Sequence, residues 1–170
     1  AIVVIGSDKR GTIYGLYHIS EKMGVSPWVY WGDATPVAKD VVQIPEKELT
    51  VTSKEPSVKY RGIFLNDEAP SLTSYAKKKF GGYNQYFYEN VYELILRCKG
   101  NYLWPAMWSN TFSEDGKGTN KLANAELADK YGIVMGTSHH EPLCRAGVEW
   151  QNKYRQYGTS NAWDFNTHET

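Results

Sequence analysis

The chain of 170 residues carries 19 Lys and Arg against 19 Asp and Glu, so its formal net charge is zero. This balance leaves no basic surplus for a nucleic-acid backbone or an anionic membrane surface, and both are excluded as expected partners. No window approaches the roughly 18 consecutive apolar residues of a membrane helix. Aromatic residues make up 14% of the chain. Their large faces suit either a packed core or a surface on which sugar rings stack.

Residues 1–57 predict the end of a small α/β domain followed by a linker. The apolar, β-branched residues 1–6 predict a strand, helical periodicity runs through residues 11–23, and residues 26–33 predict a second strand. The proline-rich residues 34–59 predict extended chain with at most one edge strand, joining two domains. Because the sequence opens inside an apolar strand, we expect it to be an internal segment of a longer protein.

Residues 58–170 predict three βα units in succession. Apolar runs begin at Tyr60, Asn101 and Ile133, and helical spacing follows each of them. Strands too apolar to have a wet face imply a parallel sheet covered by helices. The α/β fold that such units build most simply is a (β/α)8 barrel of the TIM type, of which these would be the first three units. A doubly wound open sheet is the alternative, although no G-x-G-x-x-G or P-loop pattern follows any strand.

All three predicted strands end in polar or aromatic groups, which is where barrel enzymes keep their functional residues. The first strand ends in Asn66, Asp67 and Glu68. Alternation puts Asp67 on the face opposite to Asn66 and Glu68, so both carboxylates cannot point into the barrel mouth. Asp67 is the favoured functional carboxylate, and the alternative is a helix or loop cap.

The second strand is followed by Pro105, which is poorly tolerated in a central strand. We therefore expect the strand to stop near Trp104 and the following residues to curl over the mouth. Trp108 would then be free to act as a stacking platform. The alternative, that both tryptophans belong to the core, is stronger for Trp104 than for Trp108.

The third strand ends in His139, His140 and Glu141. Zinc is disfavoured because adjacent strand residues face opposite ways and no H-E-x-x-H pattern occurs. A histidine can instead hydrogen-bond sugar hydroxyls or, when protonated, pair with a carboxylate ligand. For one of the two histidines the alternative is a structural bond to a backbone carbonyl. Glu141 joins Asp67 and Glu68 as a candidate acid or base.

Two further features carry weaker signals. Lys9 and Arg10 lie in a turn before a helix N-terminus, where backbone N–H groups favour anions such as a ligand carboxylate. Solvated surface charge is the commoner explanation for such a pair. Cys98 and Cys144 lack metal-type spacing, and two buried thiols are expected.

Four stretches carry a resemblance to a known family, namely residues 6–33, 60–70, 99–108 and 132–142. In this order they resemble glycoside hydrolase family 115, the xylan α-1,2-glucuronidases. The resemblance implies a small α/β domain before a (β/α)8 barrel, and an inverting hydrolase that needs no metal or other cofactor. It also implies that glucuronic acid or 4-O-methyl-glucuronic acid is removed from glucuronoxylan or its oligosaccharides.

For the site, the resemblance implies that the principal acid and base lie beyond Thr170, and that residues 1–170 alone are inactive. Inverting glycosidases hold their two carboxyl groups about 6.5–9.5 Å apart. The candidates within the chain are Asp67 and Glu141 for catalysis and, for sugar binding, Asn66, Trp108, His139, His140, Lys9 and Arg10. A secreted or periplasmic location and a homodimer of the full-length protein are further expectations. Two alternatives stay open, a non-catalytic carbohydrate-binding relative and a metal-dependent amidohydrolase-type barrel.

Overall fold

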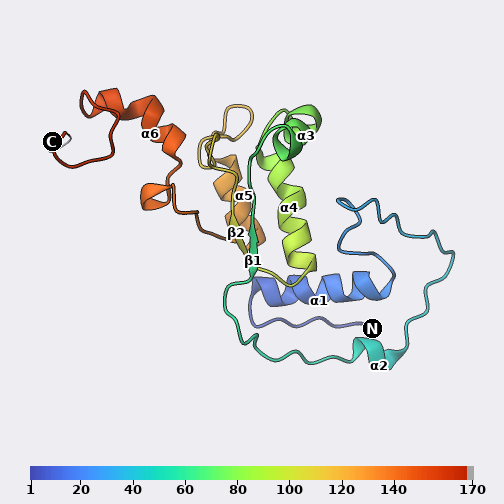
Figure 1. The fold of residues 1–170 in the computed structure, drawn as a ribbon. Coiled ribbons are helices and arrows are strands. Elements are labelled where there is room, and N and C mark those ends of the chain that lie inside the picture. The colour runs from blue at the N-terminus through green and yellow to red at the C-terminus, as the bar shows by residue number, and fades with distance from the viewer. Residues whose placement is uncertain (168–170) are drawn as a thin grey trace.

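The computed structural model describes residues 1–167, and its centre is a parallel sheet of three short strands (Figure 1). The strands are β1 (Gly62–Phe64), β2 (Tyr102–Trp104) and β3 (Val134–Met135), in the order β1-β2-β3. Ile63 lies opposite Leu103, and Leu103 lies opposite Met135. The prediction of consecutive parallel strands is confirmed. Closure of this sheet into a barrel stays a prediction.

Two helices cover one face of the sheet, as the sequence predicted. They are α4 (Gln85–Arg97), which begins where the Asn84 side chain accepts a hydrogen bond from the Tyr86 N–H, and α5 (Ala123–Tyr131). α5 ends at Gly132, whose φ of 71° is the left-handed conformation that glycine adopts without strain. The structure adds α3 (Ser71–Phe80), which the sequence analysis missed.

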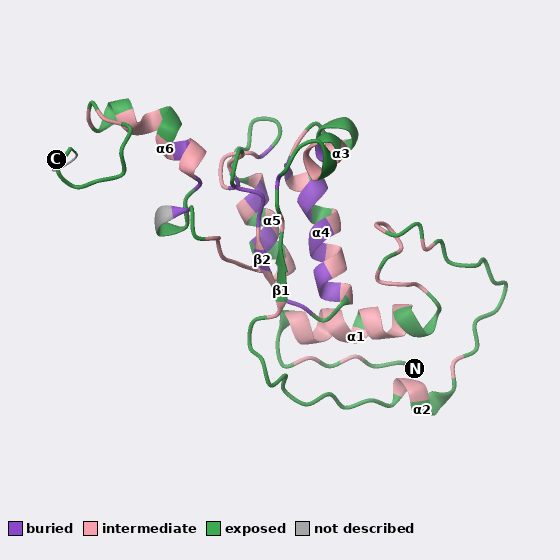
Figure 2. Cartoon of the chain, in the orientation of Figure 1, coloured by how far each residue is buried: buried purple, intermediate pink, exposed green. Residues whose placement is uncertain are grey.

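The core lies between these helices and the sheet, and it takes up much of the aromatic excess. Figure 2 shows buried positions gathered on α4 and α5, whereas β1 is exposed. The polar ends of two buried tyrosines are satisfied: the Tyr88 hydroxyl accepts from the Ala106 N–H, and the Tyr92 hydroxyl donates to the Asn124 carbonyl. Burial raises the pKa of both tyrosines far above the ordinary value. The buried apolar side chains are Ala76, Tyr83, Phe87, Tyr88, Val91, Tyr92, Ile95, Leu96, Leu103, Ala106, Met107, Phe112, Ala128, Ile133 and Ala146.

The third unit departs from the prediction that its strand is followed by one helix. The chain instead forms the short 3-10 turns η1 (Pro142–Cys144) and η2 (Tyr154–Gln156) on either side of α6 (Gly147–Lys153). Leu143 and Cys144 have φ values of 54° and 59°, so a right-handed helix cannot pass through them. α6 lies away from the sheet instead of covering it (Figure 1).

The N-terminal part contributes one long helix, α1 (Lys9–Lys22), which confirms the predicted helix. It begins where the Asp8 carboxylate accepts from the Gly11 N–H at 2.7 Å, and it packs across the end of α4. Both predicted strands are wrong. Residues 1–5 are extended but pair with no strand among the residues described, and residues 26–33 form turns closed by bonds such as Gly32 N–H to the Trp28 carbonyl.

The linker confirms the expected extended chain, with one difference. In place of an edge strand it contains one helical turn, α2 (Glu46–Leu49). The prediction of buried thiols is also wrong, because Cys98 and Cys144 are both exposed and unpaired with each other. None of the helices in residues 1–167 has both the length and the apolar composition needed to cross a bilayer.

Candidate functional site

A pocket of about 210 Å³ lies at the C-terminal ends of the three strands, where the sequence predicts the functional residues. All three strand-end segments contribute to it, so the carboxyl ends of parallel strands bring together residues far apart in the sequence. The lining combines aromatic, amide, imidazole and carboxylate groups. The lining residues are Phe64, Asn66, Glu68, Pro105, Met107, Trp108, Ser138, His139, His140 and Glu141.

Trp108 and the two histidines form an open aromatic surface in this pocket. The Trp108 side chain is 55% exposed, as expected once Pro105 has ended β2. Its ring lies parallel to the His140 ring, at an angle of 6° with centroids 6.1 Å apart. The His139 and His140 rings are 3.9 Å apart and tilted. Trp104, in contrast, is partly buried and donates its ring N–H to the Tyr102 hydroxyl at 2.9 Å.

The pocket receives Glu68 and Asn66, whereas Asp67 points the other way. Both Asn66 and Glu68 are exposed, and the Asn66 amide donates to the Glu68 carboxylate at 3.2 Å. Asp67 is only 6% exposed and does not line the pocket. The predicted alternation of the three residues is therefore confirmed. Asp67 lies on the same side of the chain as Leu65, which packs against the core, so it does not line this pocket; its predicted role in catalysis stays a prediction.

Asp67 instead binds the segment that follows β2. Its Oδ1 accepts from the Trp108 N–H at 3.2 Å, and its Oδ2 accepts from the Ser109 N–H at 2.8 Å and from the Asn110 side-chain amide. These are the bonds of a cap, which was the alternative weighed for this residue. They connect the end of β1 to the residue that carries the aromatic surface.

Glu141 is the second carboxylate of the pocket lining. It is 7% exposed and accepts from the Ser138 hydroxyl at 2.6 Å. That bond spans the turn that contains both histidines, so it holds the third strand end in shape. Glu68 and Glu141 thus reach one pocket from the first and third strand ends, one exposed and one nearly buried.

Lys9 and Arg10 lie near the N-terminal ends of the strands, away from the pocket. Their predicted place in the site is wrong. The Lys9 ammonium donates to the Asp129 carbonyl at 2.6 Å, and the Arg10 guanidinium donates to the Gly132 carbonyl at 3.2 Å. Gly132 ends α5 and precedes β3, so both cations sit where a helix C-terminus favours positive charge. The contact joins residues more than a hundred positions apart, and no local pattern could have shown it.

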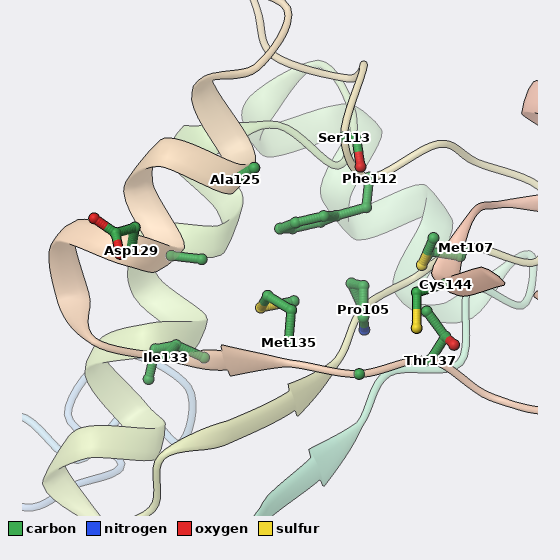
Figure 3. A pocket seen from close by; sticks show the side chains of 12 residues that line it. Pro105, Met107, Phe112, Ser113, Ala125, Asp129, Ile133, Met135, Thr137 and Cys144 are labelled. Atoms are coloured by element: carbon green, nitrogen blue, oxygen red, sulfur yellow. The ribbon is translucent and has the colours of Figure 1, made fainter.

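Figure 3 shows a second cavity, of about 310 Å³, between α5, β3 and the loop after β2. The Phe112 ring reaches across it toward α5, and it is lined by Met135 of β3 and by Ile133 just before that strand. Pro105 and Met107 separate it from the first pocket, since they line both. Its lining is mostly apolar and lacks a pair of carboxylates, so it is the weaker candidate for carbohydrate chemistry. Within the described part of the chain, no cluster of three or more His, Cys, Asp or Glu side chains could hold a metal ion.

The family model for glycosyl hydrolase family 115 matches residues 53–170, more than half of the chain. Among solved structures, the chain is similar to BtGH115A, described as a family GH115 4-O-methyl-α-glucuronidase with specificity for decorated arabinogalactans. The TM-score is 0.73 and the identity 35%, over 96% of this chain and 21% of that one. No curated protein matches. The chain therefore belongs to glycosyl hydrolase family 115.

Proposed function

We propose that this protein is an α-glucuronidase that removes glucuronic acid, or its 4-O-methyl ether, from the side chains of a polysaccharide. Membership of family 115 and the likeness to a 4-O-methyl-α-glucuronidase support the reaction class. The observation that carries the proposal is the strand-end pocket, in which the Trp108–His140 surface faces the same space as Glu68 and Glu141. The full-length protein is the proposed catalyst, since this chain spans 21% of BtGH115A.

Each group in the pocket suits one part of an acidic sugar. The exposed Trp108 ring offers an apolar face on which the C–H groups of a pyranose can pack. His139 and His140 can hydrogen-bond hydroxyls and, when protonated, pair with the uronic carboxylate. Asn66 and Glu68 add a donor and an acceptor on the other side. Glu141, like Glu68, has the carboxyl group that general acid–base chemistry uses.

We further propose inverting hydrolysis, with the principal acid and base contributed by residues beyond Thr170. Inversion needs two carboxyl groups about 6.5–9.5 Å apart, with a water molecule between the base and the sugar. Two polymers are the proposed substrates. Glucuronoxylan follows from the sequence resemblance, and decorated arabinogalactan follows from the similarity to BtGH115A. Either polysaccharide is encountered outside the cytoplasm, which agrees with a secreted or periplasmic enzyme.

The proposal is tested by measuring uronic acid release from both polymers with the full-length protein. Replacing Trp108 with alanine is expected to lower kcat/KM about tenfold, which corresponds to about 1.4 kcal/mol of lost stacking. The matched control is Trp163→Ala, because Trp163 has the same exposed fraction of 55% but lies outside the pocket. NMR of the first product formed identifies the anomer, and inversion at an α-linkage releases the β-anomer.

Two results would contradict the proposal. One is an absence of acid release from both polymers by wild-type protein, and bound polymer without release would then indicate a carbohydrate-binding relative. The other is equal activity of the Trp108→Ala and Trp163→Ala variants, which would move the site away from this pocket.

A further inference from the structure

We propose that Asp67 is a positioning residue that fixes Trp108 in the sugar-binding pocket, and that it does not itself transfer a proton. This inference rests on the proposed function, because it concerns how the aromatic surface of that site is held. It also reverses the role that the sequence suggested for Asp67. Two features support it: the hydrogen bonds that the carboxylate accepts, and the lack of strand pairing in residues 108–110 after β2.

The Asp67 carboxylate is fully engaged by one segment. Three donors on the consecutive residues Trp108, Ser109 and Asn110 converge on its two oxygens. A buried carboxylate needs such partners, and charge-assisted hydrogen bonds of this kind are stronger than neutral ones. With these donors on both oxygens and 6% exposure, the group is closed off from a sugar in the pocket.

The Asp67 backbone is anchored as well, so the carboxylate is a fixed reference point. The Thr73 hydroxyl on α3 donates to the Asp67 carbonyl at 2.7 Å and lies 3.1 Å from the Tyr83 hydroxyl. Tyr83 belongs to the buried core. The position of Asp67 is therefore set by packed elements and does not depend on the loop that it binds.

Residues 108–110, which Asp67 binds, are not part of a strand. Because β2 ends at Trp104, strand pairing does not define the path of residues 108–110. Trp108 is 55% exposed, so core packing does not set its ring direction either. Hydrogen bonds to Asp67 supply the missing constraint on the backbone, which in turn aims the ring along that of His140. A ring held in place before the sugar arrives loses less conformational entropy on binding.

Asp67→Asn tests this role because it keeps the size of the side chain and removes one acceptor oxygen. The new amide would direct N–H groups toward a donor, so the segment should loosen. In the full-length protein we expect kcat/KM to fall about tenfold, mainly through KM. The same change made in a Trp108→Ala background should have less than a twofold further effect, because the group through which Asp67 acts is already gone.

The matched control is Asp115→Asn in the same loop. Both bonds that Asp115 accepts come from Thr111, from its N–H at 3.0 Å and from its hydroxyl, and neither involves residues 108–110. Its loss should leave kcat/KM within about twofold. Should Asp67→Asn fail to fold, Asn110→Ala removes a single donor and keeps the carboxylate, and it is expected to raise KM to a smaller extent.

A second readout does not depend on activity. Hydrogen exchange in peptides covering residues 105–110 should quicken in Asp67→Asn and not in Asp115→Asn, whose backbone partner is Thr111, and this holds even if wild-type protein releases no uronic acid. Unchanged exchange in that segment would overturn the proposal. So would a pH–rate profile that loses one limb in Asp67→Asn, a fall confined to kcat, or losses that multiply with Trp108→Ala, since each marks a group that acts on the reaction directly.

Discussion

At the scale of single residues, buried polar groups join the elements of this fold. Asn124 is completely buried and donates its amide to the Tyr83 carbonyl at 3.2 Å and to the Phe112 carbonyl at 2.9 Å. Its own backbone carbonyl accepts from the Tyr92 hydroxyl. One asparagine therefore connects α5 to the turn before α4 and to the loop that follows Trp108.

Replacing Asn124 with alanine should lower the free energy of unfolding by about 1–3 kcal/mol, because two buried carbonyls would lose their donor. Urea denaturation of the full-length protein measures this change. The exposed Asn152 on α6 serves as control, and its replacement should cost less than about 0.5 kcal/mol. Equal effects of the two substitutions would show that the Asn124 contacts contribute nothing.

The sequence predicted the candidate site at this scale only in part. The alternation of side chains correctly placed Asp67 on the face opposite to Asn66 and Glu68. The position of Pro105 correctly predicted an exposed Trp108. Which face of β1 looks into the pocket depends on the register, in which Ile63 lies opposite Leu103, and of these two only Leu103 is buried. Both faces of the strand are apolar in sequence, so this choice could not be made without the fold.

At the scale of elements, helices were easier to predict than strands. α1, α4 and α5 each have apolar residues at helical spacing, which a single helix can satisfy locally. A strand needs a partner, and the β-branched residues 1–5 have no neighbouring strand in the part of the chain that is described. α3 was missed because the run Lys77–Lys79 hides a short apolar face, although the left-handed Gly81 marks its end.

Ion pairs connect the separated α6 to the loop beside the pocket. The Glu114 carboxylate in that loop pairs with Lys153 and, at 3.2 Å, with Arg145. The hydrogen bond from Lys153 lowers the pKa of Glu114 below its ordinary value of 4.5. Because the pKa is lower in the folded state, ionised Glu114 stabilises the fold above pH 4.5, and this stabilisation is lost as the pH falls through the folded value.

Glu114→Gln should therefore lower stability at pH 7 by no more than about 1 kcal/mol, since the pairs are partly exposed. The gap between variant and wild type should close as the pH falls below 4.5. Denaturant midpoints measured from pH 7 to pH 3 give this profile, with Glu55→Gln in the exposed linker as control. A gap that keeps its size down to pH 3 would show that the charge of Glu114 is not what matters.

At the scale of the whole molecule, the N-terminal and C-terminal ends of the strands have different roles. α1 packs where the strands begin. The Tyr14 hydroxyl donates a hydrogen bond to the Gly100 carbonyl at 2.7 Å, and the Arg10 guanidinium donates one to the Gly132 carbonyl. The pocket lies at the other side, where the strands end. In βα barrels too, the N-terminal ends of the strands serve stability and the C-terminal ends carry the functional residues. The N-terminal segment thus supports the sheet from the side away from the pocket.

The most direct test of the central claim is a crystal structure of the full-length protein with 4-O-methyl-glucuronic acid bound. We expect the sugar ring to lie against Trp108, with its carboxylate or hydroxyls within hydrogen-bond distance of His139 or His140. Its occupied site should be the pocket that Glu68 and Glu141 line. The acid bound in the cavity beside Phe112 and Met135, or elsewhere without contact to Trp108, would contradict the account.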